Sequence, residues 1–246
     1  MTHSLNSDSR NLNISNPIEP QGFLLVNKPS DLSSFAVVKK CRYLTGVKKV
    51  GHAGTLDPFA TGLLLIAIGK PFTKQLEKFV ALDKTYSGVI AFGRDTDSYD
   101  VTGEVVNDQP LSKDFTLETI LNEKEQFMGE IDQRPPIFSA KKVNGQRSYK
   151  LARQGKTPEL KTSKVTIHDL SFSDFQDGDY PQVTISLRCS KGTYVRSIAH
   201  DLGKACGTFA YLKSLTRDAI GPYLLSDALN FEDLSEASIQ SALFST

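Results

Sequence analysis

The side chain best placed to do chemistry is Asp57, the single carboxylate in residues 51–62, which read GHAGTLDPFATG. Three glycines and a proline give this stretch the composition of a loop. Because Asp57 directly precedes Pro58, its backbone is biased toward the extended region, and this aims the short side chain. A carboxylate held in this way can act as a nucleophile or as a general base. A turn aspartate that hydrogen-bonds its own backbone is the structural alternative.

Other reactive groups have less support in the sequence. The chain has four histidines, and His52, His168 and His200 lack metal-ligand spacing with cysteines or carboxylates. Its three cysteines are far apart and have no Cys-x-x-Cys spacing, which argues against a disulfide framework and fits a reducing cytoplasm. No Gly-x-Ser-x-Gly nucleophile motif is present. We therefore expect a carboxylate to carry the chemistry.

The elements that must position Asp57 follow from the apolar pattern. The unbroken run LLLIAI at residues 63–68 predicts a strand that is buried on both faces. A second apolar strand is expected at residues 22–27. A helix that begins at Ser33 or Ser34 and ends at Gly46 should turn Phe35, Val38, Cys41 and Leu44 toward the core. Further strands are expected at residues 86–93, 103–106, 183–189 and 212–217, and further helices from about residue 71, at 117–128 and after residue 196.

Strands and helices mix without a regular βαβ rhythm, so the sequence predicts an α+β fold with a mixed, largely antiparallel sheet. The 246 residues fit one large domain or a domain with an appendage. No apolar run reaches the roughly 18 residues of a membrane span. Residues 1–20 are rich in Asn and Ser and have no apolar segment, so we expect a disordered tail and neither a signal peptide nor an anchor.

The net charge of +1 hides a strong segregation. Residues 134–164 hold nine Lys or Arg and one acid, whereas residues 95–132 hold eleven Asp or Glu and two bases. A basic stretch of this kind can attract a polyanion such as a nucleic acid. A set of solvated surface faces is the alternative.

Residues 51–64 closely resemble the catalytic signature of the tRNA pseudouridine-55 synthases, the TruB type of pseudouridine synthase. Other motifs follow in the family order: LVNKP at residues 25–29, KTY at 84–86, the acidic stretch 93–103, RPPIFSAKK at 134–142 and CSKGTYVR at 189–196. The resemblance covers about residues 22–229. It implies the pseudouridine synthase fold, with a catalytic domain at 21–230, an inserted RNA-gripping loop at about 130–160, and a short C-terminal extension at 231–246 in place of a full PUA domain. Asp31 stands where the family often has glycine, so we expect a left-handed backbone there.

The same resemblance implies an activity. The uridine at position 55 in the T loop of tRNA would be flipped out and isomerised to pseudouridine, with no metal and no cofactor. Asp57 would be the nucleophile, and Arg196 would pair with it and lower its pKa. Tyr86 would stack on the uracil, although a strand tyrosine by itself is more typical of a core. The implied substrate-binding residues are His52, which would fill the vacated base stack, Tyr194 and Leu212, which would line the base pocket, and Lys28, Lys141, Lys142 and Arg153, which would contact RNA.

The expected partner is tRNA, bound through its T arm by a monomer, with no membrane and no guide RNA. The guide-RNA-dependent type of synthase relies on a C-terminal RNA-binding domain for which residues 231–246 are too short. A tRNA-binding or tRNA-folding module, with catalysis as a secondary property, is the alternative from another class.

Overall fold

The computed structural model describes residues 20–139, 141–143, 145–148, 151, 154 and 160–245. The predicted tail at residues 1–20 lies outside the described residues apart from Pro20.

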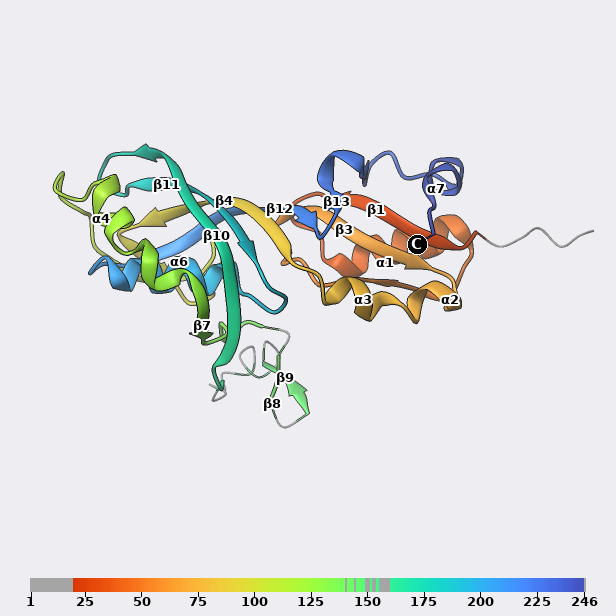
Figure 1. The fold of residues 1–246 in the computed structure, drawn as a ribbon, viewed down its shortest axis with the longest axis horizontal. Helices are drawn as coiled ribbons and strands as arrows, with labels where there is room; N and C mark the ends of the chain where they lie inside the picture. Colours follow the sequence, from red (N-terminus) through yellow and green to blue (C-terminus); the bar gives the residue numbers. More distant parts are fainter. Residues whose placement is uncertain are drawn as a thin grey trace, which may run out of the picture.

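One long sheet runs through the molecule and includes ten strands of the described chain (Figure 1). Its order is β14-β1-β3-β12-β4-β11-β10-β7, with β13 paired to β12 and β2 to β3. The pairs β1–β14 and β3–β12 are parallel and the other pairs are antiparallel, which confirms the α+β prediction. These strands are β1 (Gly22–Lys28), β2 (Val50–His52), β3 (Thr61–Ile68), β4 (Lys84–Phe92), β7 (Gly129–Gln133), β10 (Ser163–Gln176), β11 (Gln182–Cys189), β12 (Ala210–Ile220), β13 (Tyr223–Leu224) and β14 (Leu229–Asn230).

Two short hairpins lie outside this sheet. One joins β5 (Arg94–Thr96) to β6 (Val105–Asp108), and the other joins β8 (Lys142–Val143) to β9 (Gln146–Arg147). The second hairpin belongs to the connection between β7 and β10, and it projects away from the sheet (Figure 1). The insertion predicted at about residues 130–160 therefore falls between two neighbouring strands at the sheet edge.

Helices cover the sheet in two halves that share the long strands β4 and β12 (Figure 1). In one half β1 and β3 are buried on both faces, and each residue from Leu63 to Ile68 is 0% exposed, as the apolar run predicted. In the other half, Ile198 and Leu202 belong to the same core cluster as residues of β4, β11 and β12. None of the described helices is long and apolar enough to cross a membrane. The helices are α1 (Ser34–Thr45), α2 (Lys70–Thr73), α3 (Leu76–Val80), α4 (Leu117–Asn122), α6 (Val195–Ala205) and α7 (Glu236–Ala242), with 3-10 turns η1 (Lys124–Phe127) and η2 (Leu225–Asp227).

Helix α1 buries Val38 and Cys41 as predicted and packs Leu44 against the same core, but the prediction for Phe35 is wrong. Phe35 is 54% exposed, and Ser34, Val37, Val38 and Cys41 are the buried residues. The reason is local, because the Ser34 hydroxyl bonds the backbone of the Asp57 loop and so turns residue 34 inward.

The C-terminal segment packs on the core. Ile239 of α7 is 0% exposed against β1, β3 and α1, and Phe244 forms an antiparallel bridge with Phe23 of β1. Residues 231–245 therefore help to close this end of the sheet.

Candidate active site

The loop that carries Asp57 connects β2 to β3, and the segment between β1 and α1 fixes it. The Ser34 hydroxyl accepts a hydrogen bond from the Leu56 amide at 2.9 Å and donates one to the Leu56 carbonyl at 3.0 Å. The Asp31 amide donates to the Pro58 carbonyl at 2.8 Å. Asp31 reaches this carbonyl with φ of 65°, which confirms the left-handed backbone expected there. The backbone is thus bonded on both sides of Asp57.

Lys28 belongs to the same support, and this contradicts the prediction that it contacts RNA. Its side chain is 0% exposed. Its ammonium donates to the carbonyls of Pro29 and Leu32 at 2.8 Å each and of Pro58 at 3.1 Å. Burial lowers the pKa of Lys28 to about 8, and the nearby charge of Asp57 partly opposes this shift. Lys28 ties the segment before α1 to the Asp57 loop.

We expect Lys28→Met to lower the free energy of unfolding by about 2–4 kcal/mol, because three hydrogen bonds from a buried ammonium to backbone carbonyls are lost. Urea denaturation measures this loss, with the exposed Lys39→Met on α1 as the matched control. The salt dependence of RNA affinity should stay the same. A salt slope reduced by about one, with unchanged stability, would instead assign Lys28 to a phosphate contact.

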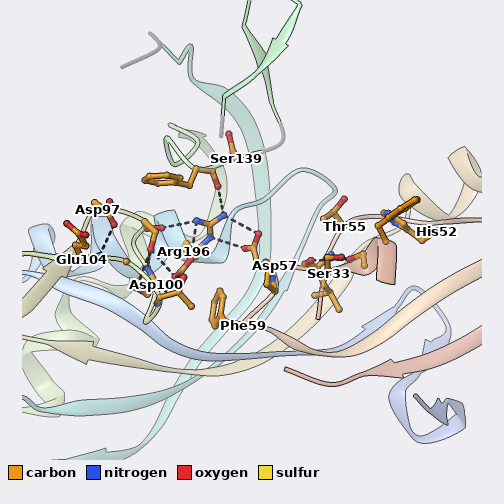
Figure 2. Close-up of a pocket in the computed structure, with 18 residues that line it drawn as sticks. Ser33, His52, Thr55, Asp57, Phe59, Asp97, Asp100, Glu104, Ser139 and Arg196 are labelled. Atoms are coloured by element: carbon orange, nitrogen blue, oxygen red, sulfur yellow. Dashed lines mark hydrogen bonds and ion pairs between the residues drawn. The ribbon is translucent and has the colours of Figure 1, made fainter. Parts of the chain in front are cut away.

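Arg196 lies in the first turn of α6 and forms the partner of Asp57. Its Nε is 2.9 Å from Asp57 Oδ2, and its Nη2 donates to Asp57 Oδ1 at 3.2 Å (Figure 2). The Arg196 side chain is 4% exposed and that of Asp57 is 35% exposed. The structure thus brings together the two residues that the sequence placed 139 positions apart.

The guanidinium is held from its other side as well. Nη1 donates to the Ser98 carbonyl at 2.8 Å and lies 3.2 Å from Asp100 Oδ2, while Nη2 also donates to the Phe138 carbonyl at 2.9 Å. Figure 2 shows Arg196 between Asp57 and Asp100. A buried arginine with this many partners is fixed in position, so it in turn orients the Asp57 carboxylate.

The electrostatics of Asp57 differ from the expectation. Burial raises the pKa of Asp57 above its ordinary value, and the neighbouring Asp100 carboxylate adds to the rise. Arg196 acts in the predicted direction and lowers this pKa, but desolvation outweighs it.

Asp57 lies where two cavities meet. One, of about 590 Å³, is lined by Phe35, His52 and the acidic turn after β5; the other, of about 270 Å³, lies on the side of β4 and β12. Tyr86 and Tyr194, both predicted from the sequence, line the smaller cavity, whereas His52 lines the larger one. The smaller cavity also contains Lys84, Ser190, Thr193, Leu215 and Arg217.

A place for Leu212 in the base pocket stays a prediction. Leu212 is 0% exposed in the core and lines neither cavity, whereas Leu215 lines the smaller one. Leu212 is covered by the turn after β5, because its amide donates to the Tyr99 carbonyl at 3.0 Å and its carbonyl accepts from the Val101 amide at 3.1 Å. A register shift in β12 between Leu212 and Ser214 adds a residue that the sequence pattern does not reveal.

Arg217 was not identified from the sequence. It is 1% exposed and stands directly opposite Tyr86 on the paired strands β12 and β4, so the two side chains share a face of the sheet. It donates to the carbonyls of Leu63 at 2.8 Å and of Gly54 at 3.2 Å. A Cβ at Gly62 would come within 2.5 Å of the Arg217 carbonyl, so this close strand approach requires glycine. Arg217 could have been recognised as a charged residue within a segment that otherwise has the pattern of a strand.

The remaining predicted RNA contacts lie on the insertion between β7 and β10. The Lys141 ammonium donates to the Lys161 carbonyl at 3.2 Å and to the Ser163 hydroxyl at 3.3 Å, so it ties the two ends of the insertion together. The side chain of Lys142 and the whole of Arg153 lie outside the described residues. RNA contacts by these three residues stay predictions.

The fold is that of the pseudouridine synthases. Two solved structures share the fold. One is a Cbf5-Nop10-Gar1 complex, which matches with a TM-score of 0.63 and 24% identity over 87% of this chain. The other is an archaeal box H/ACA sRNP Nop10-Cbf5 complex, which matches with a TM-score of 0.62 and 21% identity over 93% of this chain. The chain spans 53% and 62% of the length of those two chains.

The family follows from sequence comparison. Residues 42–195 match the model of the TruB family pseudouridylate synthases, N-terminal domain, and the chain belongs to this family. The tRNA pseudouridine synthase B of Protochlamydia amoebophila (strain UWE25) is 43% identical over 214 residues, which are 87% of this chain and 79% of that protein. The tRNA pseudouridine synthase B of Francisella tularensis subsp. novicida (strain U112) is 39% identical over 230 residues, or 94% and 75% of the two chains.

Proposed function

We propose that this protein isomerises the uridine at position 55 in the T loop of tRNA to pseudouridine, acting in the cytoplasm as a monomer without a guide RNA. The observation that carries the proposal is the Asp57–Arg196 pair, which lines the same cavity as Tyr86 and Tyr194. The relatives named tRNA pseudouridine synthase B support tRNA as the substrate.

In this reaction the bond from uracil N1 to ribose C1′ breaks, and C1′ is rejoined to C5. N1 gains a proton and C5 loses one, so no oxidant and no second substrate is consumed. Asp57 is the nucleophile, and Arg196 holds its carboxylate toward the substrate. Tyr86 stacks on the uracil, and because burial raises its pKa, its phenol stays neutral.

The uridine must leave its loop before it can reach Asp57. Flipping a base costs a few kcal/mol, and stacking and hydrogen bonds in the pocket must offset this cost. Leu215, Tyr194 and Tyr86 give the smaller cavity the aromatic and apolar lining that suits a flipped base. His52, which lines the neighbouring cavity, fills the vacated position in the RNA stack.

The test uses the purified full chain and a tRNA transcript labelled with tritium at uridine C5. We expect tritium release in the presence of EDTA and with no RNA other than the transcript, and a single pseudouridine at position 55 when the product is mapped. Release only after a guide RNA is added, or pseudouridine at another position, would contradict the proposal.

The pH dependence of the reaction should report the state of Asp57. Only the ionised carboxylate is a nucleophile, so the rate falls as the pH falls through the pKa of Asp57. Because burial raises that pKa, the acidic limb of the single-turnover rate should lie above the roughly 3.9 of a free aspartate. A rate that stays constant down to pH 4 in folded enzyme would contradict this assignment.

A further inference from the structure

Strand β5, the turn that follows it and helix α6 hold buried polar groups to which the proposed reaction gives no role. Asp95 is 6% exposed and His200 of α6 is 7% exposed. His200 Nδ1 lies 3.1 Å from Asp95 Oδ1, and because an ionised carboxylate only accepts hydrogen bonds, Nδ1 carries the proton. The His200 ring also stacks on Tyr99, with ring centroids 3.7 Å apart and an interplanar angle of 13°. One imidazole therefore contacts β5, through Asp95, and the turn that follows it, through Tyr99.

The backbone of this turn needs such support. Tyr99 has φ of 62°, a left-handed conformation that is uncommon for a bulky residue and persists only where the surroundings impose it. The backbone of Leu212 bonds the Tyr99 carbonyl and the Val101 amide. His200 adds the contact to the tyrosine ring, so both the main chain and the side chain of Tyr99 are held.

This turn places two groups in contact with the Arg196 guanidinium. The Asp100 carboxylate, 3% exposed, contacts Arg196 Nη1 through Oδ2 at 3.2 Å, and the Ser98 carbonyl accepts from the same nitrogen at 2.8 Å. Asp100 Oδ1 accepts from the Ser98 hydroxyl and the Thr102 amide, each at 2.9 Å. These bonds fix the side of the guanidinium that faces away from Asp57 (Figure 2).

Helix α6 links the two ends of this network. Arg196 and His200 are four residues apart on α6, so they project from the same face one turn from each other. We propose that His200 is a positioning residue: its stack on Tyr99 and its bond to Asp95 set the turn that holds Arg196, and through Arg196 they set the Asp57 carboxylate. This inference rests on the proposed function, because its effect is expressed in that reaction.

Histidine can both stack on Tyr99 and donate a hydrogen bond to Asp95, whereas phenylalanine and asparagine can each do only one of these. Phenylalanine could stack on Tyr99, but it would leave the buried Asp95 carboxylate without its donor. Asparagine could donate to Asp95, but it has no ring to stack. His200→Ala removes both contacts, whereas His200→Asn removes only the stack.

The experiment is a double-mutant cycle in the full chain, read as the single-turnover rate constant and the Kd for tRNA. We expect His200→Ala to lower the rate constant about 10–100-fold, as a displaced catalytic group does, with the Kd within threefold of wild type. In an Asp100→Asn background, the same substitution should lower the rate constant less than threefold, because both changes act through Arg196. The exposed Lys204→Ala, also on α6, serves as the control and should match wild type.

An equal fold-loss of rate in both backgrounds would overturn the inference, because it would mean that His200 acts independently of the Asp100 contact. A change in Kd with an unchanged rate constant would overturn it too. If His200→Ala does not fold, His200→Asn carries the same cycle and is judged by the same criterion. Failure of the wild-type protein to release tritium would contradict the proposed function itself, whereas additivity in an active enzyme contradicts only the role of His200.

Discussion

Asp57→Asn is expected to abolish turnover, with a loss of at least about 10⁴-fold in the single-turnover rate constant, because a neutral amide is not a nucleophile. The asparagine has nearly the same shape, and Arg196 keeps its contacts with Asp100, Ser98 and Phe138. The fold and the affinity for tRNA should therefore change little. The measurements are tritium release with enzyme in excess, tRNA affinity by gel shift, and thermal unfolding of the same preparation.

The matched control is Asp108→Asn on β6. The Asp108 carboxylate is 45% exposed and pairs with Arg94 at 3.1 Å, and it lines neither cavity. It tests whether the loss of one carboxylate matters at any position. Activity of Asp57→Asn within tenfold of wild type, in folded protein that binds tRNA, would remove Asp57 from the chemistry.

Strands and helices were predictable where the pattern of apolar residues within one element was enough to define it. The apolar run from Leu63 to Ile68 predicted a strand buried on both faces, and a further strand was expected at residues 183–189; both are present. Helix α1 has its predicted start and end, but its buried face depends on the bond from Ser34 to Leu56. That bond joins segments 22 residues apart, and periodicity within the helix does not report it.

In the active site, too, local motifs were predictable and long-range packing was not. Asp57 and Arg196 were found because each lies in a recognisable motif, and the structure places them in contact. The surroundings that decide how they behave come from long-range packing. The charge pattern left open whether the acid-rich residues 95–132 form a solvated face, and the structure buries Asp95 and Asp100, because His200 and Arg196 provide partners from α6.

For Lys28 the sequence suggested a contact with the substrate, whereas the structure shows contacts within the protein. A lysine in a motif next to a reactive loop is naturally interpreted as a contact with an anionic substrate. In the structure its ammonium donates to three backbone carbonyls, and the position of a backbone carbonyl cannot be recognised from a sequence. Charge alone therefore did not distinguish a residue that binds RNA from one that holds the loop in place.

Arg196→Lys is the second substitution with a large expected effect, a fall of about 10²–10³-fold in the single-turnover rate constant with tRNA affinity within threefold of wild type. The planar guanidinium contacts both Asp57 oxygens and still reaches Asp100 and two carbonyls. A lysine ammonium is a single point with three donors, so it cannot meet these groups together. The carboxylate then loses its orientation, while the RNA-facing surface is unchanged.

The pH profile separates this explanation from a general loss of structure. Arg196 lowers the pKa of Asp57 against the effect of burial, so a poorer cation should leave that pKa higher and move the acidic limb of the rate toward higher pH. Arg188→Lys on β11 is the control, because its guanidinium is 55% exposed and its ion pair with Asp83 is 4.0 Å long. If Arg196→Lys weakened tRNA binding and the rate constant equally and left the acidic limb in place, Arg196 would be a contact with RNA, and the orientation of Asp57 would need another source.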